Sequence, residues 1–531
     1  MPDEPTPSSE PQTGGAIDRR RLLGAIGVGA GATAVGATAA VAQDRGRNRG
    51  DGRGRPNRAP DGDRANRFTR IFDDLPPFAE PTAEVVEALR AIGEPGGIMD
   101  AGDDLTAAPI DLGTDPALSV DNPNHPSGPA GMTFVGQFID HDLTRDAGST
   151  LGQPTPVRRS TNLRTPRLDL DSVYGGGPGD SPHLYASDGV RLRLEHGGIA
   201  EDLPRDDTGQ AIVGDPRNDE NLMVSGFHAA LIAFHNACAD LSDGQGFEET
   251  ARVVRWHWQW VVAHEVIPAF VGQAMTDSVL TDGPRVFTDD DPRIPVEFQT
   301  SAYRFGHSMI RPSYVANFTG NDGAPFGGLV FDPEAERSED PIDLRGGHRA
   351  PRRFIDWQGF FDFGDGSVQH HKRLDTTLSS VLFRLPLAAI DSVRGEPVGP
   401  TSLASRNLLR HLTWQIPSGQ RVAAAMGVDP LSPADLSDLE PFGNRLQQST
   451  PLWFYVLREA DLIADGAHLG PVGGRIVAEV LIGLMRADSG SWLNTMPDWQ
   501  PTLPMADPAA GFRMTDLLRF AGVDPESRRA A

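Results

Sequence analysis

The stretch GQFIDHDLT, residues 136–144, places a histidine between two carboxylates within otherwise apolar sequence. Buried carboxylates are costly unless they are paired, bound to a metal or covalently bonded, so this placement needs a chemical reason. Successive residues of a helix lie about 100° apart, so Asp140 and Asp142 would face different neighbours while Gln137 shares the face of His141. The three residues Asp-His-Asp alone would also fit a solvated turn, anchored by the apolar pair before them.

Four later segments concentrate polar groups in a similar way: TPRLDLDSVYG at 165–175, GDPRNDEN at 214–221, AYRFGHSMIRP at 302–312 and LASRNLLR at 403–410. Together with GQFIDHDLT, and in this order, these segments resemble the signature segments of the animal-type haem peroxidases, in the bacterial branch of that superfamily. The superfamily includes myeloperoxidase, lactoperoxidase, peroxidasin and the cyclooxygenases. The resemblance spans roughly residues 68–525. It implies a mainly α fold, an animal haem peroxidase-like helical domain with haem in a central helical core.

Composition and periodicity agree with a helical enzyme-sized domain. The chain has 531 residues, of which 38% are hydrophobic, which is ample for a core. Its 73 acidic residues exceed its 48 basic residues, and the formal net charge of −25 argues against nucleic acid as a partner. Strand-like alternation is short and rare. Apolar residues recur at three- and four-residue spacing, which predicts helices, in the segments 219–242, 248–274, 403–426 and 476–485.

The first 42 residues predict an export signal. RRRLL at 19–23 resembles a twin-arginine motif, a Gly/Ala-rich run follows, and Ala40 and Ala42 fit a signal-peptidase site. An uncleaved anchor is the alternative, although Gly and Ala make a poor membrane span. Residues 43–66 are rich in Arg, Gly, Asp and Pro and predict a disordered linker before a peroxidase domain at 67–531. We expect a secreted, periplasmic or cell-surface protein with no membrane span after cleavage.

The resemblance implies which residues hold haem b from the proximal side. His307 matches the ligand of the haem iron, and Arg304 lies three residues earlier, so that both side chains can face the haem. Gly306 would let the macrocycle approach the backbone closely. Asn407 falls where the family places the acceptor for the second ring nitrogen of the ligand. Without the resemblance, His307 would be read as a helix-packing histidine and Asn407 as an amide that satisfies backbone groups.

The resemblance also implies the distal side. His141 would move the proton of hydrogen peroxide, with Gln137 on the same helix face, and Arg217 would stabilise the developing charge. Asp140 and Glu220 match the residues that form ester links to the haem in this family. The neighbour of Glu220 is Asn221, where myeloperoxidase has a methionine that makes a third, sulfonium link. Without the resemblance, Arg217 and Glu220 would be an ordinary exposed ion pair.

A calcium site is expected beside the distal helix. Calcium takes 6 to 8 oxygen ligands, and TPRLDLD at 165–171 alternates oxygen-bearing positions. A polar-faced strand would show the same alternation. The expected ligands are Asp142, Thr165, the carbonyl of Arg167, Asp169 and Asp171, of which Asp171 replaces a serine of the family.

The resulting hypothesis is an exported haem peroxidase that uses hydrogen peroxide to oxidise a small anionic or phenolic donor, with bromide, iodide or thiocyanate preferred over chloride. A haem-dependent fatty-acid dioxygenase of the cyclooxygenase type is one alternative. It would need a tyrosine three residues before the proximal histidine, where this chain has Arg304, with Tyr303 one position earlier. The other alternative is a non-enzymatic binding protein of the same fold, which would need the loss of a catalytic residue. None is missing from the sequence.

Three remaining groups have simpler interpretations. Cys238 is the sole cysteine and is expected to be a small buried hydrophobe. The pair His264-Glu265 lacks the second histidine of a zinc-protease motif. The pair His370-His371 is expected to lie on the surface. Lys372 is the only lysine in the chain, which we attribute to compositional bias.

Overall fold

The computed structural model describes residues 67–525, apart from residue 147 and the short stretches 197–199, 242–243, 289–291, 321–322, 335–339, 348–349, 387–389, 391, 394–395 and 398. The expected export signal at 1–42 and the expected linker at 43–66 lie outside the described residues.

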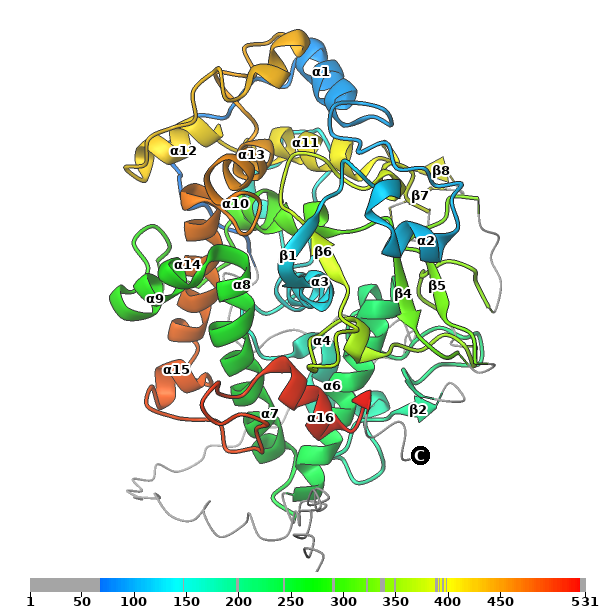
Figure 1. Cartoon of the computed structure of the whole chain (residues 1–531). Coiled ribbons are helices and arrows are strands. Elements are labelled where there is room, and N and C mark those ends of the chain that lie inside the picture. Colours follow the sequence, from blue (N-terminus) through cyan, green and yellow to red (C-terminus); the bar gives the residue numbers. More distant parts are fainter. Residues whose placement is uncertain are drawn as a thin grey trace, which may run out of the picture.

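The described residues are mainly helical, which confirms the predicted fold class (Figure 1). The longer helices are α1 (Ala83–Gly93), α3 (Gly131–Leu143), α6 (Leu222–Leu241), α7 (Phe247–Val261), α9 (Gln273–Asp282), α11 (Leu403–Thr413), α13 (Leu452–Ala464) and α14 (Pro471–Ala487). The shorter ones are α2 (Pro109–Thr114), α4 (Asp171–Tyr174), α5 (Gly177–Asp180), α8 (Ile267–Val271), α10 (Val296–Thr300), α12 (Gly419–Ala425), α15 (Trp492–Thr495) and α16 (Met514–Ala521). Short 3₁₀ helices connect many of them, and those beside the site are η5 (Pro216–Asp219) and η7 (Ala302–Met309).

Strands are short, as the sequence predicts, and they occur in antiparallel pairs. Within the described residues each sheet has two strands. The pairs are β1 (Asn124–Pro129) with β6 (His370–Lys372), β2 (Glu195–His196) with β3 (Glu201–Asp202), β4 (Ser313–Asn317) with β5 (Phe326–Leu329), and β7 (Ser392–Val393) with β8 (Glu396–Pro397).

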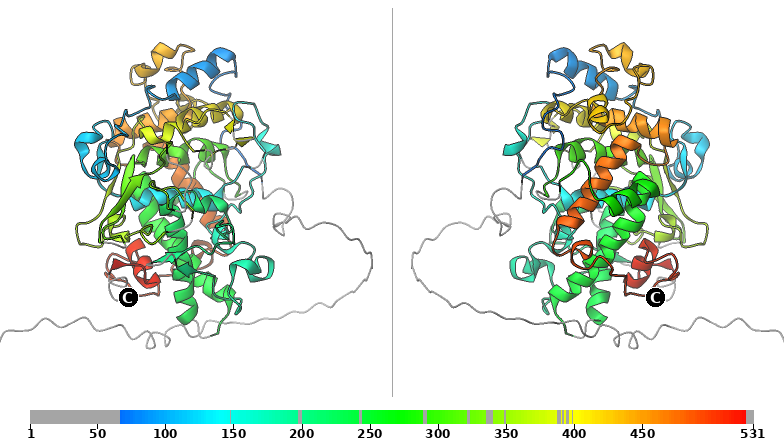
Figure 2. Two further views of the ribbon diagram at one scale, coloured as in Figure 1. Left: turned by 90° about the vertical axis from the view of Figure 1, so that its right-hand side faces the viewer. Right: turned by 90° about the vertical axis from the view of Figure 1, so that its left-hand side faces the viewer.

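Helix α3 lies near the centre of the molecule. It contacts α6 on one side and η7 on another, and η7 contacts α13 and α14 in turn. In Figure 1 the β1–β6 ribbon runs alongside α3, and the side views of Figure 2 show the long helices around this central region. The stretch that carries His141 is therefore enclosed by helices that are distant in sequence.

The start and the apolar face of α3 explain its central position. A Cβ on Gly131 would lie 2.4 Å from Cζ of Phe361, so only glycine allows the helix to begin this close to its neighbour. Further along, Phe138 is fully buried, with its ring centroid 5.3 Å from that of Phe227 and 6.0 Å from that of Trp258. These contacts fix the helix on a face about 100° away from Gln137.

Two predicted long helices are interrupted. The segment 248–274 consists of α7, a π-helical turn η6 (Val262–Val266) and α8. The segment 403–426 is not one helix but two, α11 and α12. Between them Gln415 has a φ of +48°, and Ile416 precedes a proline, a position that disfavours helical backbone.

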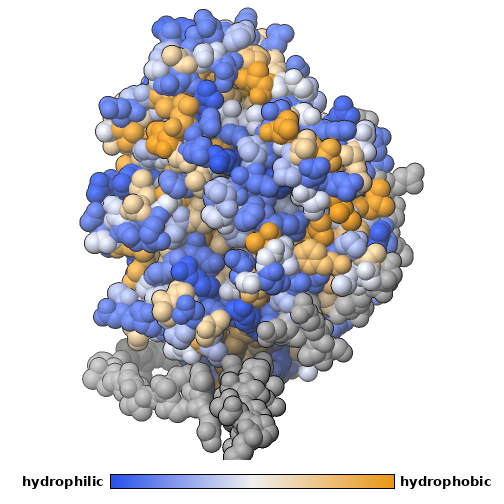
Figure 3. All heavy atoms as spheres, viewed as in Figure 1, coloured by the Kyte–Doolittle hydropathy of each residue, from blue (hydrophilic) through white to orange (hydrophobic). Residues whose placement is uncertain are grey.

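In a chain that forms a core, apolar helices are expected inside the protein and polar residues on its surface. Helix α6 is the one described helix long and apolar enough to cross a membrane, and its apolar stretch is 83% buried inside the protein. The face drawn in Figure 3 is mostly hydrophilic, with apolar residues scattered among polar ones. Cys238 on α6 is buried, as predicted.

The prediction of a surface pair at 370–371 is wrong for His371. Its side chain is buried, and its ring lies 4.7 Å from that of His125, centroid to centroid. His370 keeps part of its surface accessible. The cause is the pairing of β6 with β1, in which both His371 and Lys372 are buried.

Candidate active site

Two elements face each other across a hollow deep in the protein. On α3, Gln137 and Asp140 keep accessible surface although their neighbours in the helix are mostly buried. On η7, Arg304 and His307 do the same, and a Cβ added to Gly306 would meet no atom within 4 Å. The charge of Asp140 also acts on the pKa of both Arg304 and His307, so the two elements share one electrostatic environment.

One ring nitrogen of His141 lies within hydrogen-bonding distance of a neighbouring side chain, and the other does not. Its Nδ1 lies 2.9 Å from Oδ1 of Asn218, and its Nε2 lies 4.0 Å from Oε2 of Glu220. Burial, with the nearby charge of Arg217, lowers the pKa of His141 to about 4. The imidazole is therefore neutral at neutral pH and can accept a proton.

Asn218 was not anticipated from the sequence. Besides contacting His141, its Nδ2 lies 3.0 Å from Nδ1 of His228 on α6. Burial lowers the pKa of His228 to about 3, so that ring is neutral as well. The available signal was weak: a polar residue next to Arg217 in the 214–221 segment and a lone histidine in an otherwise apolar helix.

Arg217 lies beside His141, as expected, and is firmly oriented. Its Nε donates to Oδ1 of Asp215 at 3.1 Å, and its Nη2 donates to the carbonyl of Thr144 at 2.6 Å. Among the described residues, no group accepts a hydrogen bond from Nη1. Burial raises the pKa of the neighbouring Glu220 to about 7, although Arg217 acts in the opposite direction.

The two other distal residues are also fixed. Oε1 of Gln137 accepts a hydrogen bond from Nδ2 of Asn221 at 3.0 Å, and Oδ1 of Asn221 accepts one from the backbone N–H of Val224 at 2.9 Å. The carboxylate of Asp140 accepts one from the hydroxyl of Thr144 at 2.8 Å. Gln137, Asp140, His141, Arg217 and Glu220 thus form one group.

The proximal candidates are also brought together. Nδ1 of His307 lies 2.7 Å from Nδ2 of Asn407, and Oδ1 of Asn407 is buried with no hydrogen-bond partner among the described residues. Burial and the charge of Arg304 lower the pKa of His307 to about 3. If the amide of Asn407 turned over, its oxygen would accept from an N–H at Nδ1 and Nε2 would be left free to bind a metal.

A positive cluster surrounds His307. Burial, followed by the charge of Arg410, lowers the pKa of Arg304 to about 10. Nε of Arg304 donates to the carbonyl of Gln299 at 2.9 Å.

Tyr303 is buried, with its ring stacked on Phe298 at 4.6 Å, and its hydroxyl has no hydrogen-bond partner among the described residues.

The sole lysine anchors the residue after His307. Nζ of Lys372 is fully buried and donates to Oδ1 of Asp375 at 2.7 Å, to the carbonyl of Thr377 at 2.9 Å and to Oγ of Ser308 at 3.2 Å. An ammonium group has three N–H donors, so this site satisfies its charge and its hydrogen bonds. Its role is structural, which composition alone did not reveal.

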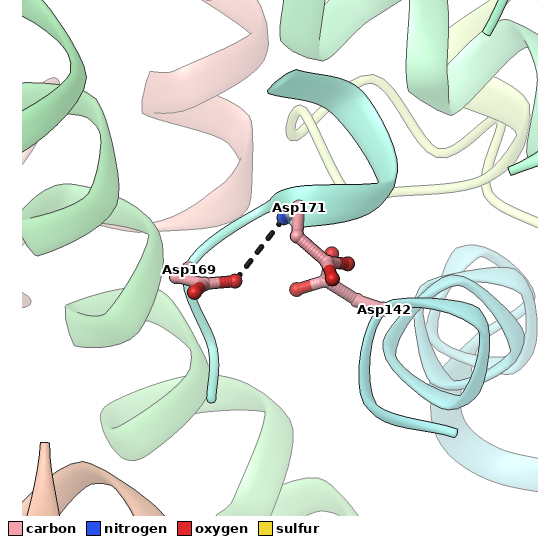
Figure 4. Close-up of side chains that lie close together, drawn as sticks. All are labelled: Asp142, Asp169 and Asp171. Carbon is pink, nitrogen blue, oxygen red and sulfur yellow. Dashed lines mark hydrogen bonds between the residues drawn. The ribbon is translucent and has the colours of Figure 1, made fainter. Parts of the chain in front are cut away.

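The residues expected to bind calcium form a compact cluster, shown in Figure 4. Asp142, Asp169 and Asp171 each offer a carboxylate oxygen, and these oxygens lie within 4.8 Å of one another. The hydroxyl of Thr165 donates to Asp169 at 3.0 Å and to Asp171 at 3.2 Å. The carbonyl of Arg167 accepts no hydrogen bond from the described residues and remains available.

Burial makes this cluster costly without a cation. Burial and the charge of Asp171 raise the pKa of Asp142 well above its usual range and the pKa of Asp169 to about 7. Arg164 lies 3.3 Å from Asp171, and backbone N–H groups of Leu170 and Ser172 donate to Asp142 at 3.1 Å. One arginine does not balance one buried and two partly buried carboxylates.

A cavity of about 640 Å³ opens on the Glu220 side. Its lining includes Glu220 and Asp219 together with Arg345 and Phe331, but neither His141 nor His307. It therefore borders the site at Glu220 and is not the hollow between the histidines. Gly346 lines this cavity and packs closely against Asp219, because a Cβ at this position would lie 1.5 Å from the carbonyl oxygen of Asp219.

Comparisons with known proteins match this geometry. Residues 121–326 match the family model described as animal haem peroxidase. This segment contains both candidate histidines, Arg217, Glu220 and the acidic cluster, while Asn407 lies beyond it. Dual oxidase of Drosophila melanogaster is 28% identical over 237 residues, and peroxidasin homolog pxn-2 of Caenorhabditis elegans is 25% identical over 238 residues.

These relatives are much longer than the shared region. Each alignment covers 38% of this chain, but only 14% of the dual oxidase and 18% of the peroxidasin homolog. Among solved structures, peroxidase A from Dictyostelium discoideum has a TM-score of 0.51 at 16% identity and covers 82% of this chain and 90% of its own. Fatty acid alpha-dioxygenase of Arabidopsis thaliana has a TM-score of 0.53 at 13% identity and covers 86% of this chain and 76% of its own. These likenesses show the fold.

Proposed function

We propose that this chain, a member of the animal haem peroxidase superfamily through its domain at residues 121–326, reduces hydrogen peroxide and oxidises a small anionic or phenolic donor. The comparisons confirm the resemblance drawn from the sequence at the level of the superfamily and support an oxidoreductase of peroxidase type. The observation that carries the proposal is a pair of histidines, buried His141 and partly buried His307, on two elements that face one hollow. Each has one ring nitrogen beside an asparagine.

The residues around the hollow fit haem b. With its amide turned over, Asn407 would place its oxygen, which has no partner among the described residues, against the N–H that a ligating His307 would carry on Nδ1. The open space at Gly306 admits a flat macrocycle. Arg304 and Arg410 would supply positive charge to its two propionates. Asp140 and Glu220 would form ester links from the distal side. When bound, haem supplies the iron redox chemistry by which peroxide is reduced and a donor oxidised.

The distal residues supply the proton chemistry. Neutral His141 accepts a proton from hydrogen peroxide at Nε2 and returns it to the leaving oxygen. Arg217 supports this step through Nη1, because its other nitrogens are already bound to Asp215 and to backbone carbonyls. A fixed cation stabilises developing negative charge without reorganisation.

Asn221 decides the proposed halide preference. Both ends of its amide are hydrogen-bonded, and it offers no sulfur for the sulfonium link that the family's methionine makes. Without that electron-withdrawing link, bromide, iodide or thiocyanate should be oxidised in preference to chloride. Steady-state rates for each anion at matched pH test this, and chloride turnover equal to that of bromide would contradict it.

Haem retained by the denatured chain in mass analysis would report the esters of Asp140 and Glu220.

The acidic cluster is proposed to bind one calcium ion. Asp142 connects it to α3, one residue after His141, so the ion would hold the helix that carries the distal base. Thr165, Asp169 and Asp171 would supply side-chain oxygens, and Arg167 a carbonyl oxygen.

We also propose export by the twin-arginine route, on the basis of the first 42 residues.

Three variants of the full chain test the enzyme. The wild type should bind haem b with a Soret band and react with peroxide. His307→Ala should lose or change that band, whereas His141→Ala should keep it and react with peroxide about 100-fold more slowly or worse. His257→Ala removes another buried histidine, whose Nε2 accepts a hydrogen bond from the backbone of Thr502, and should change neither. A native Soret band in His307→Ala would refute the proposed ligand.

A fatty-acid dioxygenase is the second candidate, favoured by the hydroxyl of buried Tyr303, which has no hydrogen-bond partner in the part of the chain that the structure describes. Arg304 occupies the position where the cyclooxygenases have their radical-forming tyrosine, which weighs against this activity. Oxygen uptake with palmitate, abolished in Tyr303→Phe, would replace the peroxidase proposal with the dioxygenase. Uptake that is absent in the wild type would remove this candidate.

A further inference from the structure

Asn218 forms a bridge between two buried histidines. Its Oδ1 lies 2.9 Å from Nδ1 of His141, and its Nδ2 lies 3.0 Å from Nδ1 of His228. Asn218 has no exposed surface, and His228 is 1% exposed. Water therefore has no access through which to replace either contact, and each must be made by the correct donor and acceptor.

The chemistry of the amide assigns the hydrogens. An amide oxygen only accepts, so Nδ1 of His141 must carry a hydrogen. An amide NH₂ only donates, so Nδ1 of His228 must be a bare nitrogen, with the hydrogen on its Nε2. The lone pair of His141 then lies on Nε2, the nitrogen that faces Glu220 at 4.0 Å.

We propose that Asn218 is a positioning residue, held in orientation by His228, that keeps His141 in the tautomer with its hydrogen on Nδ1 and its lone pair on Nε2. The use of that lone pair in peroxide chemistry rests on the proposed function, but the tautomer itself does not.

The contribution of His228 becomes clear when the opposite orientation of the Asn218 amide is considered. With the amide turned over, Nδ2 would donate to His141, whose hydrogen would then have to move to Nε2. That form could not accept a proton from a molecule bound beside Glu220. The structure records the orientation in which Nδ2 lies 3.0 Å from Nδ1 of His228. In that orientation a bare Nδ1 on His228 accepts from the NH₂ group, and it would repel the amide oxygen if the amide turned over.

The test reads the tautomer by spectroscopy. The full chain is labelled with ¹⁵N-histidine and loaded with zinc protoporphyrin, which is diamagnetic, and long-range ¹H–¹⁵N correlations identify the ring nitrogen that carries hydrogen. His141→Gln and His228→Gln assign the signals. In the wild type we expect hydrogen on Nδ1 of His141 and on Nε2 of His228. The same spectrum is recorded for the protein as purified, so the measurement does not depend on porphyrin uptake.

Two substitutions of Asn218 give opposite expectations. Asn218→Leu keeps the volume but removes both contacts, and His141 should become a mixture of tautomers. Asn218→Asp offers only acceptor oxygens, so His141 should keep its hydrogen on Nδ1 while His228 moves its hydrogen from Nε2 to Nδ1. Asn317→Leu is the matched control because this buried amide in β4 donates to two backbone carbonyls far from His141 in sequence. It should leave both tautomers unchanged.

Kinetics with the haem b form separate this proposal from the enzyme assignment. Asn218→Leu should slow the reaction with peroxide by roughly 10- to 100-fold at an unchanged Soret band, the usual cost of losing a partner that orients a functional imidazole. Asn218→Asp should restore most of the rate. A wild-type His141 with hydrogen on Nε2, or a tautomer unchanged in Asn218→Leu, overturns the proposal. A wild type with the expected tautomer and no peroxide reaction overturns only the proposed function. If the leucine variant does not fold, the tautomer of His228 in Asn218→Asp decides.

Discussion

The partner of the proposed iron ligand is an amide, not a carboxylate. Asn407 is completely buried and touches Nδ1 of His307. An amide oxygen accepts a neutral hydrogen bond, whereas a carboxylate would draw the hydrogen of Nδ1 more strongly and make the imidazole more electron-rich. The side chain at position 407 should therefore help to set the reduction potential of the bound iron.

Asn407→Asp is expected to lower that potential. A charge-assisted hydrogen bond exceeds a neutral one by about 1 kcal/mol, which for one electron corresponds to about 40 mV. Potentiometric titration of the haem-loaded protein measures the shift, and Asn317→Asp is the control for a buried amide outside the site. A potential that stays the same or rises in Asn407→Asp would show that Asn407 does not interact with the iron ligand.

Single residues of the site differ in how far the sequence could identify them. His141 and His307 stand in segments dense in polar groups, and the structure brings both to the same hollow. Asn218 could not be predicted in its role, because that role depends on a rotamer and on His228, which lies in the following helix. His371 was misjudged because two adjacent histidines resemble a surface pair until strand pairing turns one inward.

At the scale of elements, the loop before α4 and the end of α3 meet through the acidic cluster. One calcium per chain should remain after exhaustive dialysis, as measured by elemental analysis. Chelation with EGTA should lower the melting temperature, because an ion that binds only the folded state stabilises it by about 2.7 kcal/mol at 100 times its dissociation constant. Asp169→Asn should weaken calcium binding, whereas Asp438→Asn, a substitution at a surface acid, should not. Active protein without bound calcium would contradict the proposed site.

The segment after β6 is tied to η7 by Lys372. Lys372→Met should lower the free energy of unfolding in urea by about 3 kcal/mol, because it leaves Asp375 without its cation. The double variant Lys372→Met/Asp375→Leu should cost less than the lysine variant alone, since no uncompensated charge remains. Breaking the exposed pair Arg352–Asp340, with side chains 36% and 43% accessible, should cost at most about 1 kcal/mol. Equal costs for the buried and exposed pairs would rule out an anchoring role for Lys372.

Helices were predictable in kind but not in every boundary. Apolar spacing indicated α6, α7, α11 and α14. The break before α12 follows from Pro417, which the spacing alone did not register. The π-helical turn Val262–Val266 left no sequence signal, because one added residue shifts the helical period without changing its apolar composition.

At the scale of the whole molecule, the charge of −25 opposes the approach of every anionic donor. The cavity beside Glu220 offers little local compensation. Arg345 is its basic lining residue, but Nε of Arg345 donates to both carboxylate oxygens of Asp343. Two further acids, Asp219 and Glu220, line the same cavity. Asp219 is paired with Arg205 at 2.7 Å, and burial raises the pKa of Glu220 to about 7, so neither adds a full negative charge to the cavity. Anions should therefore meet a repulsive potential mainly at a distance.

Oxidation of thiocyanate should accelerate as salt is added. The Debye length shortens from about 30 Å at 0.01 M ionic strength to about 8 Å at 0.15 M, so most of the repulsion by the protein surface is screened over this range. We expect the second-order rate constant for thiocyanate to rise by roughly two- to five-fold, a modest case of electrostatic control of association. An uncharged phenol measured in the same sodium sulfate series is the control and should show no change. A thiocyanate rate that falls with salt would mean that the unpaired edge of Arg345 attracts anions strongly enough to outweigh the net charge, and Arg345→Gln would then abolish the dependence.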